Sequence, residues 1–243
     1  MNNNIDTVER VAIRMEETIL RILSAHSFTP KDFTSRELTL SQAYCLLWQN
    51  SKTGEVSGRQ GSHELLAGCA SAVLLDLFVM GKIVVSVTDD CSHGALVKNV
   101  HTSPTGSYFD RAMLNNIVKH QNKYPGYRQK LRYWIQYETR FVPKRRCATI
   151  TLDSLAEQGI LEKKESMFRT DYPSIDPGPK GAFIKELHRV LLEGEVPDVY
   201  LRTLLTLIHA VDSLEGPWES ILAKYFTDDQ LTRVQGKVLE CIW

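Results

Sequence analysis

The chain has 243 residues, of which 43% are hydrophobic and 24% charged, and its 29 lysines and arginines balance 29 aspartates and glutamates. A chain of this length can bury a sizeable hydrophobic core. Its neutral total charge excludes a global electrostatic field that would draw it to nucleic acid or to an anionic membrane, so attraction of that kind requires a local basic patch.

The cysteines and the apolar stretches indicate the redox compartment and the kind of membrane contact to expect. Five cysteines stand singly, without a Cys-x-x-Cys pair, which argues against a zinc site or a disulfide framework and fits a reducing compartment. Residues 1–4 lack the basic and apolar regions of a signal peptide. The longest apolar stretch, 65–80, is too short and too interrupted to span a bilayer. Any membrane contact is therefore expected to be peripheral.

The N-terminal segment is predicted to be an amphipathic helix followed by a linker. Asp6 and Glu9 have the spacing of a capping box, and apolar residues follow at helical spacing. Residues 27–37 are polar and contain a proline, which predicts a linker. We therefore divide the chain into an N-terminal helix with its linker, 1–37, and a helical domain, 38–243.

The start of the helical domain predicts two helices and a hairpin. Thr39 or Ser41 is expected to cap an apolar helix. Residues 62–80 are apolar nearly all round and are followed by Gly81, which predicts a central bundle helix that ends at a left-handed glycine. Two short β-branched runs within 83–97, separated by turn residues, predict a β-hairpin.

The second half of the chain is predicted to be mostly helical. Residues 159–170 are read as an extended segment that follows a helix. Further helices are expected at 108–120, 127–137, 143–158, 180–193, 197–214 and 217–226, and after a capping box at 227–230. The pattern amounts to about eight to ten helices and two short hairpins, a mainly α fold.

No group of residues has the spacing of an enzyme site. Ser57 is one residue short of a nucleophile elbow and fits a flexible loop better. His209 stands in a very apolar helix, which favours a buried, hydrogen-bonded structural histidine. Cys69 and Cys147 are read as core thiols. Since nothing assembles a base, a nucleophile and an orienting group, we predict that the protein is not an enzyme.

A metal site is considered for the tip of the first hairpin. Asp89, Asp90, Cys91 and His93 supply suitable ligand types. Residues clustered so closely in a hairpin tip are more often solvated turn formers. We predict neither a metal nor a cofactor.

Two basic clusters are candidates for binding phosphate. The first, at the start of a predicted helix, is Lys144, Arg145 and Arg146. The second is Arg128, Lys130 and Arg132, which flank Tyr127, Tyr133 and Trp134. Guanidinium groups offer forked donors suited to phosphate, and a helix N-terminus adds its own partial positive charge. The alternative is a solvated face balanced by Glu138 and Asp153.

A winged-helix arrangement is a further alternative. The predicted helix 143–158 is followed by an extended segment with Lys163 and Lys164, which resembles a recognition helix with its wing. The helix also carries Asp153 and Glu157, and the chain is neutral. DNA binding is therefore the weaker choice, and we predict no nucleic-acid partner.

Short motifs in one order across residues 38–240 carry a resemblance to a known family. They are Leu38-Thr39-Leu40, Leu66-Ala67-Gly68-Cys69, Leu74-Leu75-Asp76-Leu77, Gly81-Lys82-Ile83, Pro104-Thr105-Gly106, Trp134-Ile135, Leu155-Ala156-Glu157-Gln158-Gly159-Ile160-Leu161, Tyr172-Pro173, His209-Ala210 and Asp212-Ser213-Leu214-Glu215. Each motif alone is weak, but the ordered series is fairly specific. It resembles the Golgi phosphoprotein 3 family.

The resemblance implies a fold and a function. The fold would be a four-helix core wrapped by further helices, with a β-hairpin used in self-association. Members sit on the cytosolic face of the Golgi, bind phosphatidylinositol 4-phosphate, and retain glycosyltransferases through their cytosolic tails. The expectation is therefore a cytoplasmic peripheral membrane adaptor, located at the Golgi if the source is eukaryotic. A protein-interaction module of the same fold without lipid binding is the alternative.

The family's lipid site carries over only in part. The family uses a loop tryptophan, an arginine near the start of the central helix, and two arginines three residues apart before the Gly-Ile/Val-Leu junction. Here Gly61 stands nearest the tryptophan, Ala67 or Ala70 replaces the helix arginine, and Ala148 replaces one of the paired arginines. Losing such contacts, each worth about 1.5–3 kcal/mol, weakens the site. The expected phosphate-binding residues are Arg145, Arg146, Lys144 and Arg59.

Overall fold

The computed structural model describes residues 7–56, 62–87, 94–139, 147–167, 169–214 and 220–242. Its α-helices are α1 (Thr7–Ser24), α2 (Lys31–Thr34), α3 (Leu40–Trp48), α4 (His63–Val79), α5 (Asn115–Lys123), α6 (Leu131–Thr139), α7 (Cys147–Glu157), α8 (Gly178–Glu193), α9 (Val199–Asp212) and α10 (Asp228–Cys241). A π-helical turn, η2 (Asp110–Leu114), leads into α5, and a 3-10 turn, η3 (Leu222–Lys224), precedes α10. The strands are β1 (Ile83–Val87), β2 (Ala95–Asn99), β3 (Gln129–Lys130), β4 (Lys164–Glu165) and β5 (Thr170–Asp171).

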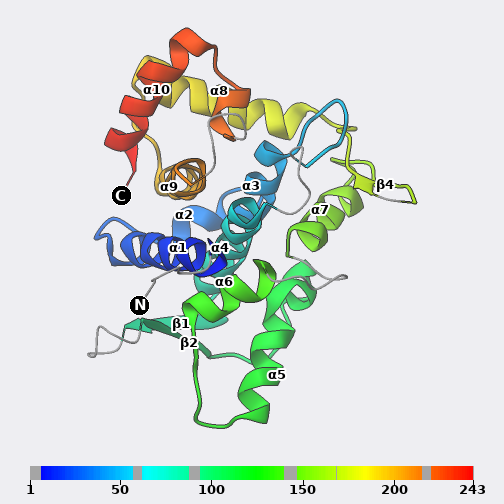
Figure 1. Ribbon diagram of the computed structural model, residues 1–243, viewed down its shortest axis with the longest axis vertical. Helices are drawn as coiled ribbons and strands as arrows, with labels where there is room; N and C mark the ends of the chain where they lie inside the picture. The colour runs from blue at the N-terminus through cyan, green and yellow to red at the C-terminus, as the bar shows by residue number, and fades with distance from the viewer. Residues whose placement is uncertain are drawn as a thin grey trace.

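Helix α4 is the centre of the molecule (Figure 1). Every residue from Leu65 to Leu77 is buried, because the helix is apolar nearly all round and α1, α3, α6, α7 and α9 pack against it. The helix ends before Gly81, whose φ of +67° is the left-handed conformation expected there. The predicted mainly α fold, a helical bundle with short β-hairpins, is confirmed.

The junction of α3 and α4 is held by a buried carboxylate. Thr39 caps α3 in a capping box with Gln42. Asp76 of α4 accepts hydrogen bonds from the backbone N–H groups of Leu40 and Ser41, both at 2.9 Å, and from the Ser41 hydroxyl at 2.6 Å. Burial raises the pKa of Asp76 to about 6, although these hydrogen bonds act in the opposite direction. The family-like motifs around residues 38–40 and 74–77 therefore meet in one contact.

A glycine lets α3 and α4 approach closely. The hydroxyl of Tyr44, on α3, donates to the carbonyl of Leu65 at 3.2 Å. A Cβ at Gly68 would lie 2.2 Å from that Tyr44 oxygen and 2.7 Å from a methyl group of Val211. Only glycine fits this position without displacing the buried tyrosine.

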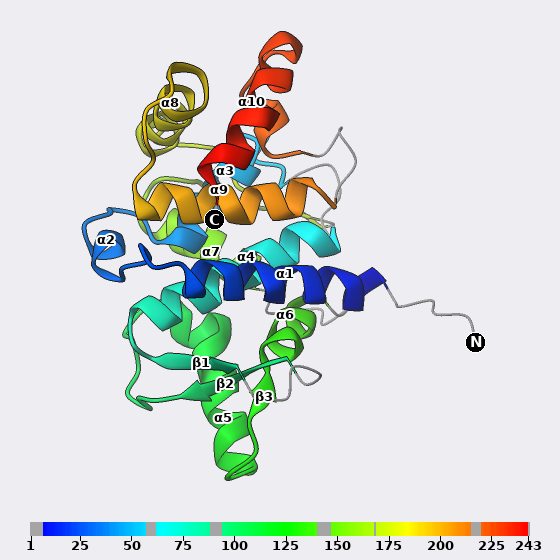
Figure 2. The same ribbon diagram turned by 90° about the vertical axis from the view of Figure 1, so that its left-hand side faces the viewer.

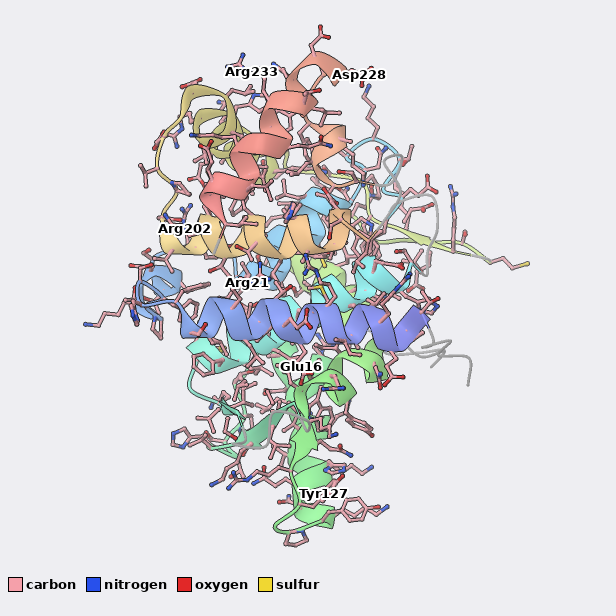
Figure 3. The ribbon with its side chains drawn as sticks, turned by 60° about the vertical axis from the view of Figure 1, so that its left-hand side comes forward. Glu16, Arg21, Tyr127, Arg202, Asp228 and Arg233 are labelled. Carbon is pink, nitrogen blue, oxygen red and sulfur yellow. The ribbon has the colours of Figure 1, made fainter. Side chains whose placement is uncertain are left out.

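Helix α1 packs into the bundle beside α4, α6 and α9. Figure 3 shows Glu16 on this helix. Glu16 is buried, accepts a hydrogen bond from the Ala95 backbone N–H at 3.1 Å, and forms an ion pair with Arg132 of α6, with an Nε–Oε2 distance of 2.9 Å. Within the segment read as a linker, Phe33 of α2 packs against the ring of Tyr200, 5.4 Å between centroids. The division at residue 37 stays a prediction.

Two small antiparallel sheets complete the fold. In the first, β1 pairs with β2 as predicted, and β2 pairs with β3 so that Leu96 faces Lys130. In the second, β4 pairs with β5. The predicted helix start at Tyr127 is wrong, because the backbone of Gln129 and Lys130 pairs with β2 and α6 begins only at Leu131.

The C-terminal region confirms one predicted element and corrects another. The capping box of Thr227 and Gln230 opens α10 as expected. The predicted helix 217–226 is wrong over its described part, which holds only the 3-10 turn η3, and residues 215–219 lie outside the described ranges. The Asp212 carboxylate accepts the backbone N–H groups of Ile221 and Leu222, which fixes this segment in a tight turn.

Candidate functional site

The predicted phosphate-binding residues lie outside the described part of the chain. This holds for Lys144, Arg145, Arg146 and Arg59, and for Gly61 at the family's tryptophan position. The alanines at the other family positions are described. Ala67 and Ala70 are fully buried in α4, and Ala148 is buried in α7. These three positions belong to the core and offer a phosphate no surface.

The second basic cluster is described, and its members play different roles. Arg132 is the partner of the buried Glu16. Arg128 and Lys130 form no ion pair with a described residue. The Asp153 carboxylate pairs with Lys163 at 3.1 Å and accepts the Tyr172 hydroxyl at 2.7 Å. Its expected balance of the run 144–146 stays a prediction, because that run lies outside the described residues. The side chain of Glu138 lies outside the described set.

A pocket of about 710 Å³ lies beside this cluster, between α5, β3 and α6. Aromatic rings form much of its wall, and lysines contribute from α5. No carboxylate is among its described lining residues, which are Asn116, Lys119, His120, Lys123, Tyr124, Tyr127, Gln129, Tyr133 and Trp134. An anion entering the pocket would therefore meet cations, amides and ring edges.

His120 occupies the middle of these rings. Its ring centroid lies 5.0 Å from that of Tyr124, and it meets the Trp134 ring edge-on at 5.8 Å. The side-chain amide of Gln129 reaches His120 Nε2 at 3.2 Å. If the amide donates, the neutral imidazole carries its proton on Nδ1. The packing holds this aromatic cluster together through contacts from both helices.

The chain between α5 and β3 makes a tight turn that presents two tyrosines. The Tyr127 N–H donates to the Tyr124 carbonyl at 3.1 Å, Pro125 takes the second position, and Gly126 has a φ of +85°. These are the features of a type II turn. Tyr124 is 46% exposed and Tyr127 59% exposed. Figure 3 shows Tyr127 at the end of the molecule opposite to α10.

The stretch around this turn is free of acidic residues. Residues 111–137 contain no aspartate or glutamate. Two of its cations are paired, Arg111 with Glu157 at 3.1 Å and Arg132 with Glu16. Those that form no ion pair with a described residue are Lys119, Lys123, Arg128 and Lys130. We call residues 119–130 the α5–α6 tip; it is the kind of local basic patch that a neutral chain needs in order to attract an anion.

Only part of this tip was predicted from the sequence. Arg128, Lys130 and Tyr127 were singled out, whereas Lys119 and His120 were missed. Helix α5 brings these two residues to the pocket that Tyr127 also lines. Two signals were available in the sequence. These are the absence of acidic residues over 111–137 and the Tyr-Pro-Gly-Tyr turn at 124–127.

The other candidate residues offer no reactive constellation. His209 is half-buried on the wall of a cavity of about 370 Å³ between α9 and α10, and not fully buried as expected. Burial lowers its pKa, and the charges of Arg14 and Arg21 act in the same direction. The thiols of Cys69 and Cys147 are buried, as predicted.

No described group of three or more His, Cys, Asp or Glu side chains is placed to hold a metal ion. The ligand types considered at the first hairpin, Asp89, Asp90, Cys91 and His93, lie outside the described residues, as does Ser57.

The hairpin that follows α7 has the position of the predicted wing, but its lysines are paired. Lys163 lies 2.9 Å from Glu165, in addition to its contact with Asp153, and Lys164 lies 3.0 Å from Glu162. Met167, near the hairpin tip, is 89% exposed, and Phe168 is outside the described residues. These intramolecular pairs leave the wing little free positive charge for a nucleic acid.

The comparison with known families agrees with the buried motifs. A sequence model described as Golgi phosphoprotein 3 (GPP34) matches residues 40–235, from the start of α3 into α10. The chain belongs to the Golgi phosphoprotein 3 family. The predicted resemblance is thereby confirmed, and the family is associated with the Golgi. No curated protein matches the chain in a sequence comparison.

One question for a member of this family is whether its described helices could cross a membrane. None of those described has both the length and the apolar character required to cross a membrane. The α5–α6 tip is a described surface that combines exposed aromatic rings with cations that form no ion pair with a described residue.

Proposed function

We propose that this chain is a peripheral membrane adaptor of the Golgi phosphoprotein 3 family, and not an enzyme. The observation that carries the proposal is the family match over residues 40–235. The resemblance adds the two ligands of such an adaptor, phosphatidylinositol 4-phosphate and the cytosolic tails of membrane enzymes. In a eukaryotic source, the protein would act on the cytosolic face of the Golgi.

The lipid part of the proposal rests on basic residues. Lys144, Arg145 and Arg146 directly precede α7 in the sequence, and charge-assisted hydrogen bonds from such groups suit a phosphate. Arg59 belongs to the same proposed set. The family's tryptophan and two of its arginines are missing here, so we expect weaker headgroup binding than the full set of contacts would give.

Vesicle flotation tests the lipid part. We expect the full chain to float with phosphatidylcholine vesicles that contain phosphatidylinositol 4-phosphate more than with vesicles that lack it. The double substitution Arg145→Ala and Arg146→Ala should reduce that difference at least severalfold. Equal flotation of the wild type and the variant would count against this site.

The adaptor part is tested separately. Immobilised cytosolic-tail peptides of Golgi glycosyltransferases should retain the full chain, whereas peptides of the same composition in scrambled order should not. Retention of the protein on tails together with no flotation on any vesicle would select the alternative, a protein-interaction module without lipid binding. Loss of both activities would contradict the adaptor proposal.

A further inference from the structure

We infer that the α5–α6 tip docks on the anionic surface of a bilayer through its bulk negative charge, independently of any one headgroup. The inference rests on the proposed function as a peripheral membrane protein and names the surface that makes the contact. It concerns residues different from the basic run at 144–146.

The position of the tip suits contact with an extended flat partner. In Figures 1 and 2, α5 and the turn that follows it form one end of the molecule, opposite to α8 and α10. The turn presents Tyr124 and Tyr127, which are 46% and 59% exposed, and it has Pro125 at its second position and Gly126 in the left-handed conformation. Because the turn is already ordered, binding costs little backbone entropy.

The side chains of the tip have the chemistry of a membrane interface. A tyrosine ring combines an apolar body with a polar hydroxyl, and such rings are enriched where headgroups meet the hydrocarbon. Lys123 Nζ lies 5.1 Å from the Tyr124 ring centroid, so cation and ring are presented together. Lysine stems can cover apolar surface while the ammonium group stays among the headgroups.

The electrostatics of the tip favour an anionic lipid surface. Lys119, Lys123, Arg128 and Lys130 have no carboxylate partner among the described residues, and residues 111–137 contain no acid. Each basic residue near an anionic leaflet strengthens membrane partition about fivefold. This attraction falls with added salt, because exposed charges are screened.

A single-stranded nucleic acid, which also uses cations and rings, fits the tip less well. Bases require open ring faces for stacking. Here His120 packs edge-on against Trp134, and Tyr133 and Trp134 pack edge-on against each other, so part of the inner aromatic surface is already in use. Tyr124 and Tyr127, the most exposed of these rings, line the same pocket, and their centroids lie 5.0 Å and 6.1 Å from that of His120, so these rings too are already in ring contact.

Flotation with phosphatidylserine tests the inference on the full chain. The vesicles are phosphatidylcholine alone, or phosphatidylcholine mixed with phosphatidylserine and without phosphoinositide. Two tip variants are used, Tyr124→Ser with Tyr127→Ser, and Lys119→Gln with Lys123→Gln. The matched control is Ile175→Ser with Val196→Ser, which removes apolar side chains that are 60% and 79% exposed elsewhere.

We expect the wild type and the control to bind the phosphatidylserine vesicles in a salt-sensitive manner. Both tip variants should lose at least about tenfold in partition. Their thermal unfolding midpoints should stay within a few degrees of the wild type, since the substituted side chains are exposed.

Other outcomes separate the two proposals. Tip variants that bind as well as the wild type would overturn the inference and leave the proposed function intact. A wild type that floats only with phosphatidylinositol 4-phosphate would also overturn it. A wild type that floats with neither lipid would remove the lipid part of the proposed function as well. Salt-sensitive, tip-dependent binding of a single-stranded oligonucleotide without vesicle binding would replace the membrane with nucleic acid.

Discussion

The junction around Asp76 and the α5–α6 tip differ in how their charged groups are partnered. At the junction a buried carboxylate accepts hydrogen bonds from Leu40 and Ser41 and joins two helices. At the tip, lysines and exposed tyrosines lie at the end of the molecule without a carboxylate partner among the described residues. The first arrangement suits the stability of the fold, and the second suits binding to another molecule.

The difference explains why the family is easier to establish than the function. The motifs that carry the resemblance, such as 38–40, 66–69 and 74–77, are largely buried and shape the packing of α3 against α4. The lipid-binding positions of the family fall on buried alanines or outside the described residues. Fold and site are therefore separable in this chain, as in protein families generally.

The largest expected effect is at the junction. Asp76→Ala removes the acceptor of two backbone N–H groups and one hydroxyl, all of them buried. We expect the free energy of unfolding to fall by about 3–5 kcal/mol, measured by urea denaturation. Asp228→Ala, on the exposed first turn of α10, is the control and should cost less than about 1 kcal/mol. Equal losses for the two variants would show that the hydrogen bonds of Asp76 do not stabilise the junction more than an exposed carboxylate does.

Substitutions can compare the ion-paired Arg132 with the exposed Lys123 near the tip. Arg132→Ala leaves Glu16 buried without its partner, and we expect a loss of about 3 kcal/mol in unfolding free energy. Lys123→Ala, on the exposed end of α5, should change it by less than about 0.5 kcal/mol. If Arg132→Ala were as mild as Lys123→Ala, the distinction between structural and surface cations would fail.

Close helix packing at the junction predicts a further loss. Gly68→Ala places a methyl group 2.2 Å from the Tyr44 hydroxyl, which should cost about 1–3 kcal/mol. Gly236→Ala, in α10 with open space around it, should instead stabilise the protein by about 0.5–1 kcal/mol. Thermal melts of the two variants measure the contrast. A stable Gly68→Ala protein would show that Tyr44 can move away.

The buried Lys180 is expected to make the stability of the fold depend on pH. Lys180 donates to the backbone and side-chain carbonyls of Gln49, and burial, followed by the charge of Lys224, lowers its pKa to about 7 from 10.5. Between those values the unfolded chain holds a proton that the folded chain releases. Stability from this group therefore rises with pH, by up to about 1.4 kcal/mol per pH unit.

The difference in unfolding free energy between the wild type and Lys180→Met, measured from pH 7 to 9, should show this slope. Lys119→Met, which removes an exposed lysine, should change the pH profile little. Parallel profiles for the wild type and Lys180→Met would contradict the low pKa.

Local signals in the sequence predicted the elements that depend on neighbouring residues. The predicted signals were the cap at Thr39 or Ser41, the capping box at Thr227, the apolar run of α4 and the glycine after it. Each of them acts on residues only a few positions away in the sequence. Strand β3 and the turn η3 were missed, because pairing with β2 and the Asp212 side chain decide them from a distance. No local pattern contains those partners.

Only some residues of the candidate site could be predicted from the sequence, for the same reason. Arg128, Lys130 and Arg132 look alike in sequence, yet Arg132 is paired with a residue on α1. Lys119 and His120 join the site only because α5 packs beside α6. Charge type can be read from the sequence, whereas the pairing of each charge requires the fold.

Hydrogen–deuterium exchange of the full chain, with and without phosphatidylserine vesicles, tests the central contrast most directly. We expect slower exchange of backbone amides across residues 119–130 when vesicles are present, and unchanged exchange in α3 and α4. Protection that spares the tip while vesicles are bound, or exchange in α3 and α4 that changes as much as in the tip, would contradict this expectation.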